Sequence, residues 1–319
     1  MRIDRPKDRW LARLAGAILV IASLSLGGAL QGLPGAFACG LLGLILAQAL
    51  ARLLERRRAR RRSRRRATLA SPFPAAWRAF LAAQYDHYER LPTPLRARFE
   101  DDVRILLAET RITGVEVEVT DELRLLVAAS AATLSLAWPN YEWDQLTEVI
   151  LYPESFDHHY RFASDPEFGI DVGMYEVGHW GKELTGQTNP WGTVILSAPK
   201  LLESFADPDD GYHVGLHEFA HLLDMNQTHF DGIPVGLNAA RSREWLAVVD
   251  KEMDRLRQGK SALNRYGSES PVEFLAVAVE AFFEMPQVVR QRHREVYAIL
   301  SAYFGQDPAA WDDARGLGT

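Results

Sequence analysis

The chain has 319 residues, with 36 Lys and Arg against 42 Asp and Glu, so its formal net charge at pH 7 is −6. The charge is unevenly divided, because residues 1–66 hold 15 basic and three acidic residues and the rest of the chain therefore carries −18. So acidic a body argues against nucleic acid as a partner. The single cysteine, Cys39, excludes an intrachain disulfide and a zinc site built from several cysteines.

Two apolar stretches open the chain, at residues 10–30 and 33–54, and a short turn-like stretch, Gln31–Gly35, separates them. Each stretch has about the 20 residues that a helix needs to cross a bilayer. We therefore expect residues 1–55 to form a two-helix transmembrane hairpin that contacts membrane lipid.

A basic run follows the hairpin, with nine arginines among the eleven residues 56–66. Such runs stay on the cytoplasmic side of a membrane and attract anionic lipid. Basic residues also precede the first apolar stretch, so both ends of the hairpin are expected on that side. We expect residues 56–69 to be an Arg-rich linker at the inner (cytoplasmic) membrane, with the rest of the chain facing the cytoplasm.

The segment has two other interpretations. A cleaved signal peptide could end at Ala36–Ala38, but a second apolar stretch follows at once and the Arg run resists export. The Arg run could instead bind nucleic acid, although a basic run beside a membrane span is more often a topology signal.

Residues 70–319 are numerous enough to bury the core of one domain. Their patterns predict mostly helices with a few short strands, the α+β class. Asp121 is expected to cap one of the helices. The predicted helices are 73–88, 95–110, 121–136, 198–205, 245–257 and 287–303, and the predicted strands are 115–119, 149–152 and 192–197.

The sequence His217-Glu218-Phe219-Ala220-His221 is the most informative motif of the chain. Residues four apart lie on one face of a helix, so two imidazoles at this spacing can hold one Zn²⁺. The glutamate between them can take a proton from a metal-activated water. Apolar neighbours indicate a buried helix, and buried imidazoles need partners, which a metal would supply.

A catalytic zinc site needs a third protein ligand and an open position. Glu280 is our candidate, because a lone carboxylate in the apolar helix expected at 271–284 is costly unless it meets a cation. Glu273 is either a group that holds a ligand histidine or a first-turn acid that suits the helix dipole. Glu284 either orients a ligand imidazole or is exposed at the helix end. His213 either touches substrate or caps its helix.

The motif, the helix that carries Glu280 and several further stretches resemble the Mlc titration factor A family of zinc peptidases, over most of residues 70–310. Those further stretches are Val149–Pro153, Val194–Ser197 and Tyr266–Glu273. The resemblance implies one zinc ion on His217, His221 and Glu280, with Glu218 as the catalytic residue. It also implies a zincin-like (gluzincin) fold related to the catalytic domain of anthrax lethal factor, and aminopeptidase-type activity.

We therefore expect a membrane-tethered zinc metallopeptidase that hydrolyses peptide bonds in a peptide or protein substrate, with Glu218 as general base. Tyr266 is expected to stabilise the oxyanion, unless it is only a loop aromatic that packs on the body. The strand before the motif could pair with an extended substrate. The alternative is a peptidase-like binding module that sequesters a transcriptional regulator, since members of the family are reported to bind one.

Overall fold

The computed structural model describes residues 7–139, 141–153, 193–224 and 230–315. The chain divides into two compact units, Arg2–Ser71 and Pro72–Thr319. We describe each unit by itself. The predicted site residues His217, Glu218, His221, Tyr266 and Glu280 all belong to the second unit.

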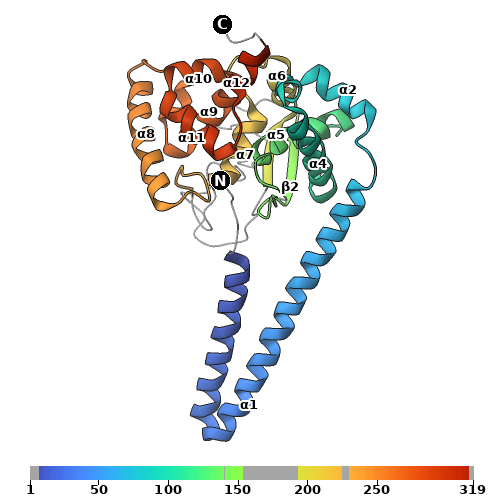
Figure 1. Ribbon diagram of the computed structural model, residues 1–319, viewed down its shortest axis with the longest axis vertical. Coiled ribbons are helices and arrows are strands. Elements are labelled where there is room, and N and C mark those ends of the chain that lie inside the picture. Colours follow the sequence, from blue (N-terminus) through green and yellow to red (C-terminus); the bar gives the residue numbers. More distant parts are fainter. Residues whose placement is uncertain (1–6, 140, 154–192, 225–229, 316–319) are drawn as a thin grey trace, which may run out of the picture. The chain divides into compact units, whose positions relative to one another are not determined.

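The first unit consists of α1 (Lys7–Leu69), which has a break at Gly32, where φ is 66° and ψ is −153°. The chain turns back there (Figure 1), at the position where the sequence predicts a turn. Arg56–Arg66, which we expected as a linker, continues the helix to Leu69. Within the described residues, no helix combines the length and the apolar character of a membrane span. The predicted transmembrane hairpin is therefore not supported.

The second unit contains a three-stranded parallel sheet in the order β1 (Arg111–Gly114), β2 (Glu148–Tyr152) and β3 (Thr193–Ser197). Arg111 pairs with Glu148, and Glu148 with Thr193. Parallel neighbours need a crossover connection, and α5 (Asp121–Ser135) provides it between β1 and β2. The strands expected at 149–152 and 192–197 are confirmed as β2 and β3.

The strand expected at 115–119 is wrong, although its residues alternate between valine and glutamate. The chain reverses directly after β1, so that the carbonyl oxygen of Val117 lies against Gly114, where even a Cβ atom would be only 2.1 Å away. Glu116 has a positive φ of 55°, which a strand residue does not adopt. The cap of α5 also differs, since the Thr120 side chain accepts the Leu123 N–H and Asp121 is the first helical residue.

Helices form most of the rest of the unit. Two predicted helices are each split in the structure, one at Tyr85 and one at His293, and a short C-terminal helix was not expected. The helices are α2 (Ala75–Gln84), α3 (Asp86–Arg90), α4 (Thr93–Glu109), α6 (Ala198–Ala206), α7 (Val214–Asp224), α8 (Ala239–Arg257), the 3-10 turn η2 (Arg265–Ser268), α9 (Pro271–Glu284), α10 (Pro286–Arg292), α11 (Arg294–Phe304) and α12 (Pro308–Arg315).

The helix α7 lies at the centre of this unit, in contact with α5, α6, α9 and β3 (Figure 1). All eleven of its residues are buried, including His217, Glu218 and His221. Close approach to α5 requires a glycine, because a Cβ on Gly215 would lie 2.2 Å from the Ser130 Oγ. The fold therefore places the predicted motif inside the protein, against a second buried helix, α9.

Candidate metal centre

The helix α7 presents its two histidines on one face. Its N-terminus is capped by His213, whose Nδ1 accepts the Leu216 N–H at 3.2 Å. Of the two roles weighed for His213, the structure shows the cap. The rings of His217 and His221 follow one turn apart, with centroids 4.9 Å apart and planes at 85°. Their spacing and burial match the predicted pair of metal ligands.

The helix α9 brings two carboxylates to the same place. It begins after Ser270, whose Oγ accepts the N–H of Glu273, so Glu273 stands in the first turn, where the helix dipole favours an anion. Glu280 follows two turns later on nearly the same face. Glu273 and Glu280 are both buried and both contact His217 on α7.

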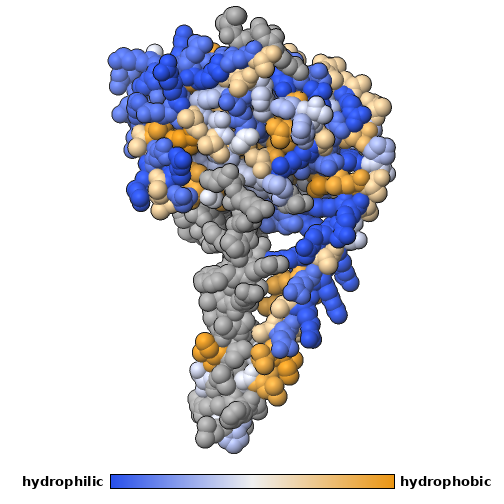
Figure 2. Space-filling view, in the orientation of Figure 1, coloured by the Kyte–Doolittle hydropathy of each residue, from blue (hydrophilic) through white to orange (hydrophobic). Residues whose placement is uncertain are grey.

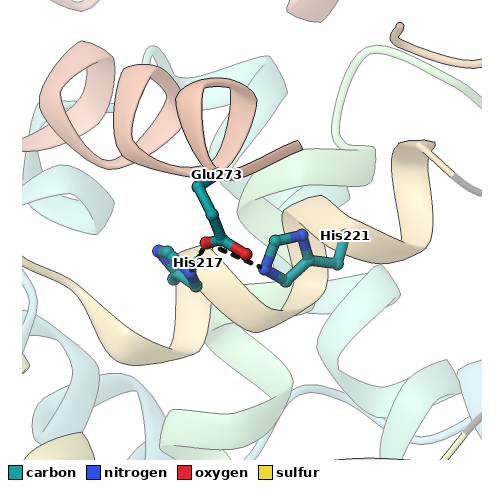
Figure 3. Close-up of side chains that lie close together, drawn as sticks. All are labelled: His217, His221 and Glu273. Carbon is teal, nitrogen blue, oxygen red and sulfur yellow. Dashed lines mark hydrogen bonds and ion pairs between the residues drawn. The ribbon is translucent and has the colours of Figure 1, made fainter. Parts of the chain in front are cut away.

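His217, His221 and Glu273 converge (Figure 3). The Oε2 atom of Glu273 lies 3.2 Å from the Nε2 of His217 and 3.7 Å from the Nε2 of His221. One nitrogen or oxygen from each of the three residues lies within 4.8 Å of the others. Two imidazole nitrogens and a carboxylate oxygen at this separation are a donor set typical of catalytic zinc.

Glu280, which we expected as the third ligand, lies outside this cluster and contacts the other nitrogen of His217. Its Oε1 accepts from Nδ1 of His217 at 2.7 Å, and its Oε2 accepts the backbone N–H of His213 at 2.6 Å. Both carboxylate oxygens therefore have partners without a metal. A carboxylate on the far nitrogen of a ligand histidine fixes the tautomer and orientation of the ring.

His221 supplies the test of whether these residues fit a metal. Only 1% of its surface is exposed, and neither ring nitrogen has a hydrogen-bond partner. Leaving a buried polar atom without a partner costs on the order of 1–3 kcal/mol. A metal bound at one nitrogen would satisfy that atom, so the residues fit a zinc ion.

The two imidazoles differ in proton affinity. Burial alone would lower the pKa of His217, but the carboxylates of Glu280 and Glu273 outweigh burial and raise it well above the usual value. Burial lowers the pKa of His221 to about 4, although Glu273 opposes this. The pKa values of the two imidazoles therefore lie far apart, with that of His217 raised and that of His221 lowered.

The two predicted catalytic residues lie beside this cluster. Glu218 is buried, and its carboxylate contributes to the raised pKa of His217. Tyr266 is half-buried on η2, with its ring centroid 6.0 Å from that of His217. Glu218 and Tyr266 thus both lie close enough to His217 to interact with it, while their catalytic roles remain predictions.

Sequence reasoning missed some features of the site. Burial and the carboxylates of Glu280 and Glu218 raise the pKa of Tyr212, a residue that the sequence analysis did not select. Glu284 is buried rather than exposed at a helix end, and burial, together with Asp210, raises its pKa to about 10. The Ser270-Pro-Val-Glu273 pattern of a helix start could have drawn attention to Glu273.

Comparison with known proteins identifies the family. Residues 57–305 match the model of the glucose-regulated metallo-peptidases, M90. The chain belongs to this family. It is 30% identical over 258 residues to Mlc titration factor A of Edwardsiella ictaluri, covering 73% of this chain and 92% of that protein. An uncharacterized protein of Synechocystis is 26% identical over 243 residues, which is 74% of this chain and 86% of the relative. The resemblance to the Mlc titration factor A family is thus confirmed.

The different positions of Glu273 and Glu280 predict different effects of substitution. Glu273→Gln should weaken zinc binding most, because it replaces the carboxylate that meets both histidines. Glu280→Gln keeps an acceptor for His217 and should weaken binding by roughly 10–100-fold. Competition titration with a chelating dye measures both. If Glu280→Gln loses more zinc affinity than Glu273→Gln, then Glu280 is the third ligand.

Zinc binding should release a proton from His217. The folded-state pKa of this residue is raised, so at neutral pH a metal must displace its proton. Affinity should therefore rise by about tenfold per pH unit up to that pKa. Calorimetry in buffers of different ionisation enthalpy counts the protons. Glu280→Gln should release fewer protons at pH 7. If the wild-type chain releases no proton when it binds zinc, the assignment of a raised pKa to His217 is wrong.

The same shift predicts how the metal-free protein responds to pH. A raised folded-state pKa stabilises the fold fully below the usual histidine pKa of the unfolded chain. This contribution is lost as the pH rises through the folded-state pKa. The melting temperature of the metal-free chain should therefore fall on the alkaline side more than that of Glu280→Gln.

Proposed function

We propose that this chain is a zinc-dependent peptidase in which His217, His221 and Glu273 hold one zinc ion. The observation that carries the proposal is the buried His221, whose ring nitrogens have no hydrogen-bond partner although a carboxylate and a second imidazole lie beside it. Three protein ligands leave a position open for water or substrate, as hydrolysis requires. Glu280 has a different role in this proposal, since it orients His217 through Nδ1.

The chemistry divides between the ion and the protein. When bound, zinc acts as a Lewis acid that lets water lose a proton near neutral pH. Glu218 accepts that proton and delivers it to the leaving amine. Tyr266 donates a hydrogen bond to the oxyanion that forms from the substrate carbonyl. Burial of Glu218 excludes bulk water from the site and favours this transfer.

The substrate in this proposal is a peptide, cleaved in the aminopeptidase manner that the family resemblance implies. Among the described strands β3 pairs with β2 alone, and in this proposal its other side pairs with an extended substrate. The helix α7 contacts β3, so a peptide paired with this strand would lie near the helix that carries the proposed zinc ligands.

Glu218→Gln tests the catalytic proposal. The amide cannot accept the proton, so kcat/KM on chromogenic aminoacyl and peptide substrates should fall by roughly 10²–10⁴-fold. Zinc content by elemental analysis should stay at one ion per chain, because Glu218 is not a ligand. Equal activity in the variant and the wild type would refute Glu218 as the base.

The second candidate function is sequestration of a transcriptional regulator. It is supported by the name of the relatives, Mlc titration factor A, which refers to a factor that titrates Mlc. The same assay separates the two candidates. Zinc-loaded chain that turns over none of the peptide substrates would favour the binding module.

We further propose that α1 attaches the protein to the inner membrane. Its described side chains are distributed inside out, since Gly40 and Gly43 are buried while Leu41, Leu42 and Ile45 are 61%, 56% and 55% exposed. A helix in water buries its large apolar residues. In hydrocarbon, small residues lie at helix contacts and large ones face lipid.

The charge of the same helix supports an anionic lipid surface as the partner. Figure 2 shows an apolar band on α1 followed by a strongly hydrophilic one. The hydrophilic band holds nine arginines in residues 56–66. Each basic residue near such a surface contributes about 1 kcal/mol of attraction. In this proposal the Arg run lies on the cytoplasmic side, and the peptidase unit faces the cytoplasm.

Flotation of the full chain with vesicles tests the attachment. Vesicles that contain phosphatidylglycerol should carry the chain with them, and pure phosphatidylcholine should carry less. Leu42→Glu with Ile45→Glu should abolish flotation. The matched control is Leu202→Glu on α6, which is 49% exposed in the other unit and should change nothing. Binding by the double variant at the wild-type level would refute the proposal. If the wild-type chain is a stable dimer and the double variant is a monomer, the apolar surface of α1 binds a second copy of the chain instead of lipid.

A further inference from the structure

A short loop, Asp231–Ile233, is tied to the end of the helix that carries the two histidines. Asp224 is the last residue of α7 and is fully buried, with 0% of its surface exposed. Its Oδ1 accepts the N–H groups of Asp231 at 3.2 Å and Ile233 at 3.1 Å, and its Oδ2 accepts that of Gly232 at 3.0 Å. One carboxylate therefore holds three consecutive backbone amides of the loop.

The same loop abuts the start of the helix that carries Glu273. Gly232 has a φ of 74°, and a Cβ placed on it would lie 2.5 Å from the carbonyl carbon of Pro271, the first residue of α9. The backbone of the loop thus touches the backbone of α9 at a point that admits no side chain. Trp245 of α8 donates from Nε1 to the Gly232 carbonyl at 2.6 Å and fixes the glycine from another side.

The position of Asp224 is unfavourable for α7 itself. An anion at the C-terminal end of a helix opposes the helix dipole. Burial disfavours the charge further and raises the pKa of Asp224 to about 7, although the amides of Gly232 and Asp231 counteract burial. Asp224 therefore weakens its own helix, yet it accepts hydrogen bonds from the neighbouring loop with both oxygens. Its role is explained better by the contacts of that loop than by the stability of α7.

Two residues that the loop contacts, Asp224 and Pro271, lie close in sequence to proposed zinc ligands. Asp224 follows His221 by three residues, and Pro271 precedes Glu273 by two. The loop therefore connects the two helices whose separation sets the distance from the histidine pair to the carboxylate. Because metal geometry tolerates displacements of only about 0.5 Å, a loosened connection should weaken binding.

We propose that Asp224 and Gly232 are positioning residues, which form a clamp that sets the distance of Glu273 from His217 and His221 and so tunes metal affinity. The clamp rests on the proposed function, because it acts on the proposed zinc ligands. It adds residues that touch neither the ion nor the substrate.

Two substitutions in the full chain test the clamp, with zinc and cobalt as probes. Asp224→Asn keeps the shape and can accept two of the three amides, but its own N–H₂ group faces the third. Gly232→Ala pushes directly on Pro271. Each should weaken zinc binding by on the order of tenfold, the effect typical of groups that support ligands. Each should also shift the visible absorption of the cobalt-substituted protein, which reports the ligand geometry.

The matched control is Asn238→Ala at the start of α8. Asn238 caps that helix by accepting the N–H groups of Ala240 and Arg241, so its loss lowers stability without touching the loop contact with α9. Thermal melts of the metal-free chains show how far each variant is destabilised. Asn238→Ala should bind zinc as the wild type does, with an unchanged cobalt spectrum.

The outcomes separate the clamp from the site that it serves. If Asp224→Asn and Gly232→Ala melt earlier but keep the zinc affinity and cobalt spectrum of the wild type, they are merely structural and the clamp is refuted. If a variant does not fold without metal, the cobalt spectrum of the other decides. If the wild-type chain itself binds no zinc, the proposed function fails instead.

Discussion

A histidine held between two carboxylates of one helix is the interaction on which the rest of this site depends. His217 contacts Glu280 through Nδ1 and Glu273 through Nε2, and both acids belong to α9. Charge of this kind is costly to bury, so each group must find its partner on the facing helix. The pairing therefore fixes how α7 lies along α9. It also leaves Glu273 within reach of the second imidazole, His221.

The fold around this pair keeps two largely buried helices, α7 and α9, in one register. Gly215 allows α7 to approach α5 closely, and His213 both caps α7 and donates its backbone N–H to Glu280. At the other end, Asp224 holds the loop that touches the start of α9. Contacts at both ends restrict sliding of the helices more than one central pair could. Sliding is the motion that would most disturb the three proposed ligands, which come from two helices.

The sequence predicted the parts of the site that a single helix determines. The spacing of His217 and His221 places both on one face whatever α7 packs against. The choice between Glu273 and Glu280 is different, because the two acids are two turns apart and share a face of α9. Periodicity cannot say which of them reaches the metal side of His217, since that depends on the register between helices. The cost of burying Glu280 pointed towards a cation, yet a backbone amide and an imidazole satisfy it.

The fold shows the same division: local sequence patterns predicted some elements, while tertiary contacts decided others. Strands β2 and β3 were predicted from their apolar runs, and in the structure β3 is buried throughout while β2 buries Val149 and Leu151. The alternating residues after β1 do not form a strand, because the chain turns back after Gly114. The carbonyl oxygen of Val117 then packs so closely against Gly114 that no side chain would fit there. The split at His293 of the helix predicted over 287–303, into α10 and α11, has a similar origin. That histidine is bonded to Glu252 of α8 and to the amide of Ala262, contacts that no local pattern reveals.

Charge explains why a site of this composition calls for a divalent ion rather than for protons alone. Three carboxylates, those of Glu218, Glu273 and Glu280, are buried beside the two imidazoles. The pKa of His217 is raised by its carboxylate neighbours, whereas that of His221 is lowered by burial to about 4. Burial and the neighbouring His217 lower the pKa of His221, so protonating this imidazole does little to compensate the acidic side chains beside it. A divalent ion brings two charges to the same volume and needs neutral imidazoles as ligands. The lowered pKa of His221 thus leaves this imidazole available as a metal ligand, while Glu273 and Glu280 favour a proton on His217 that a metal would have to displace.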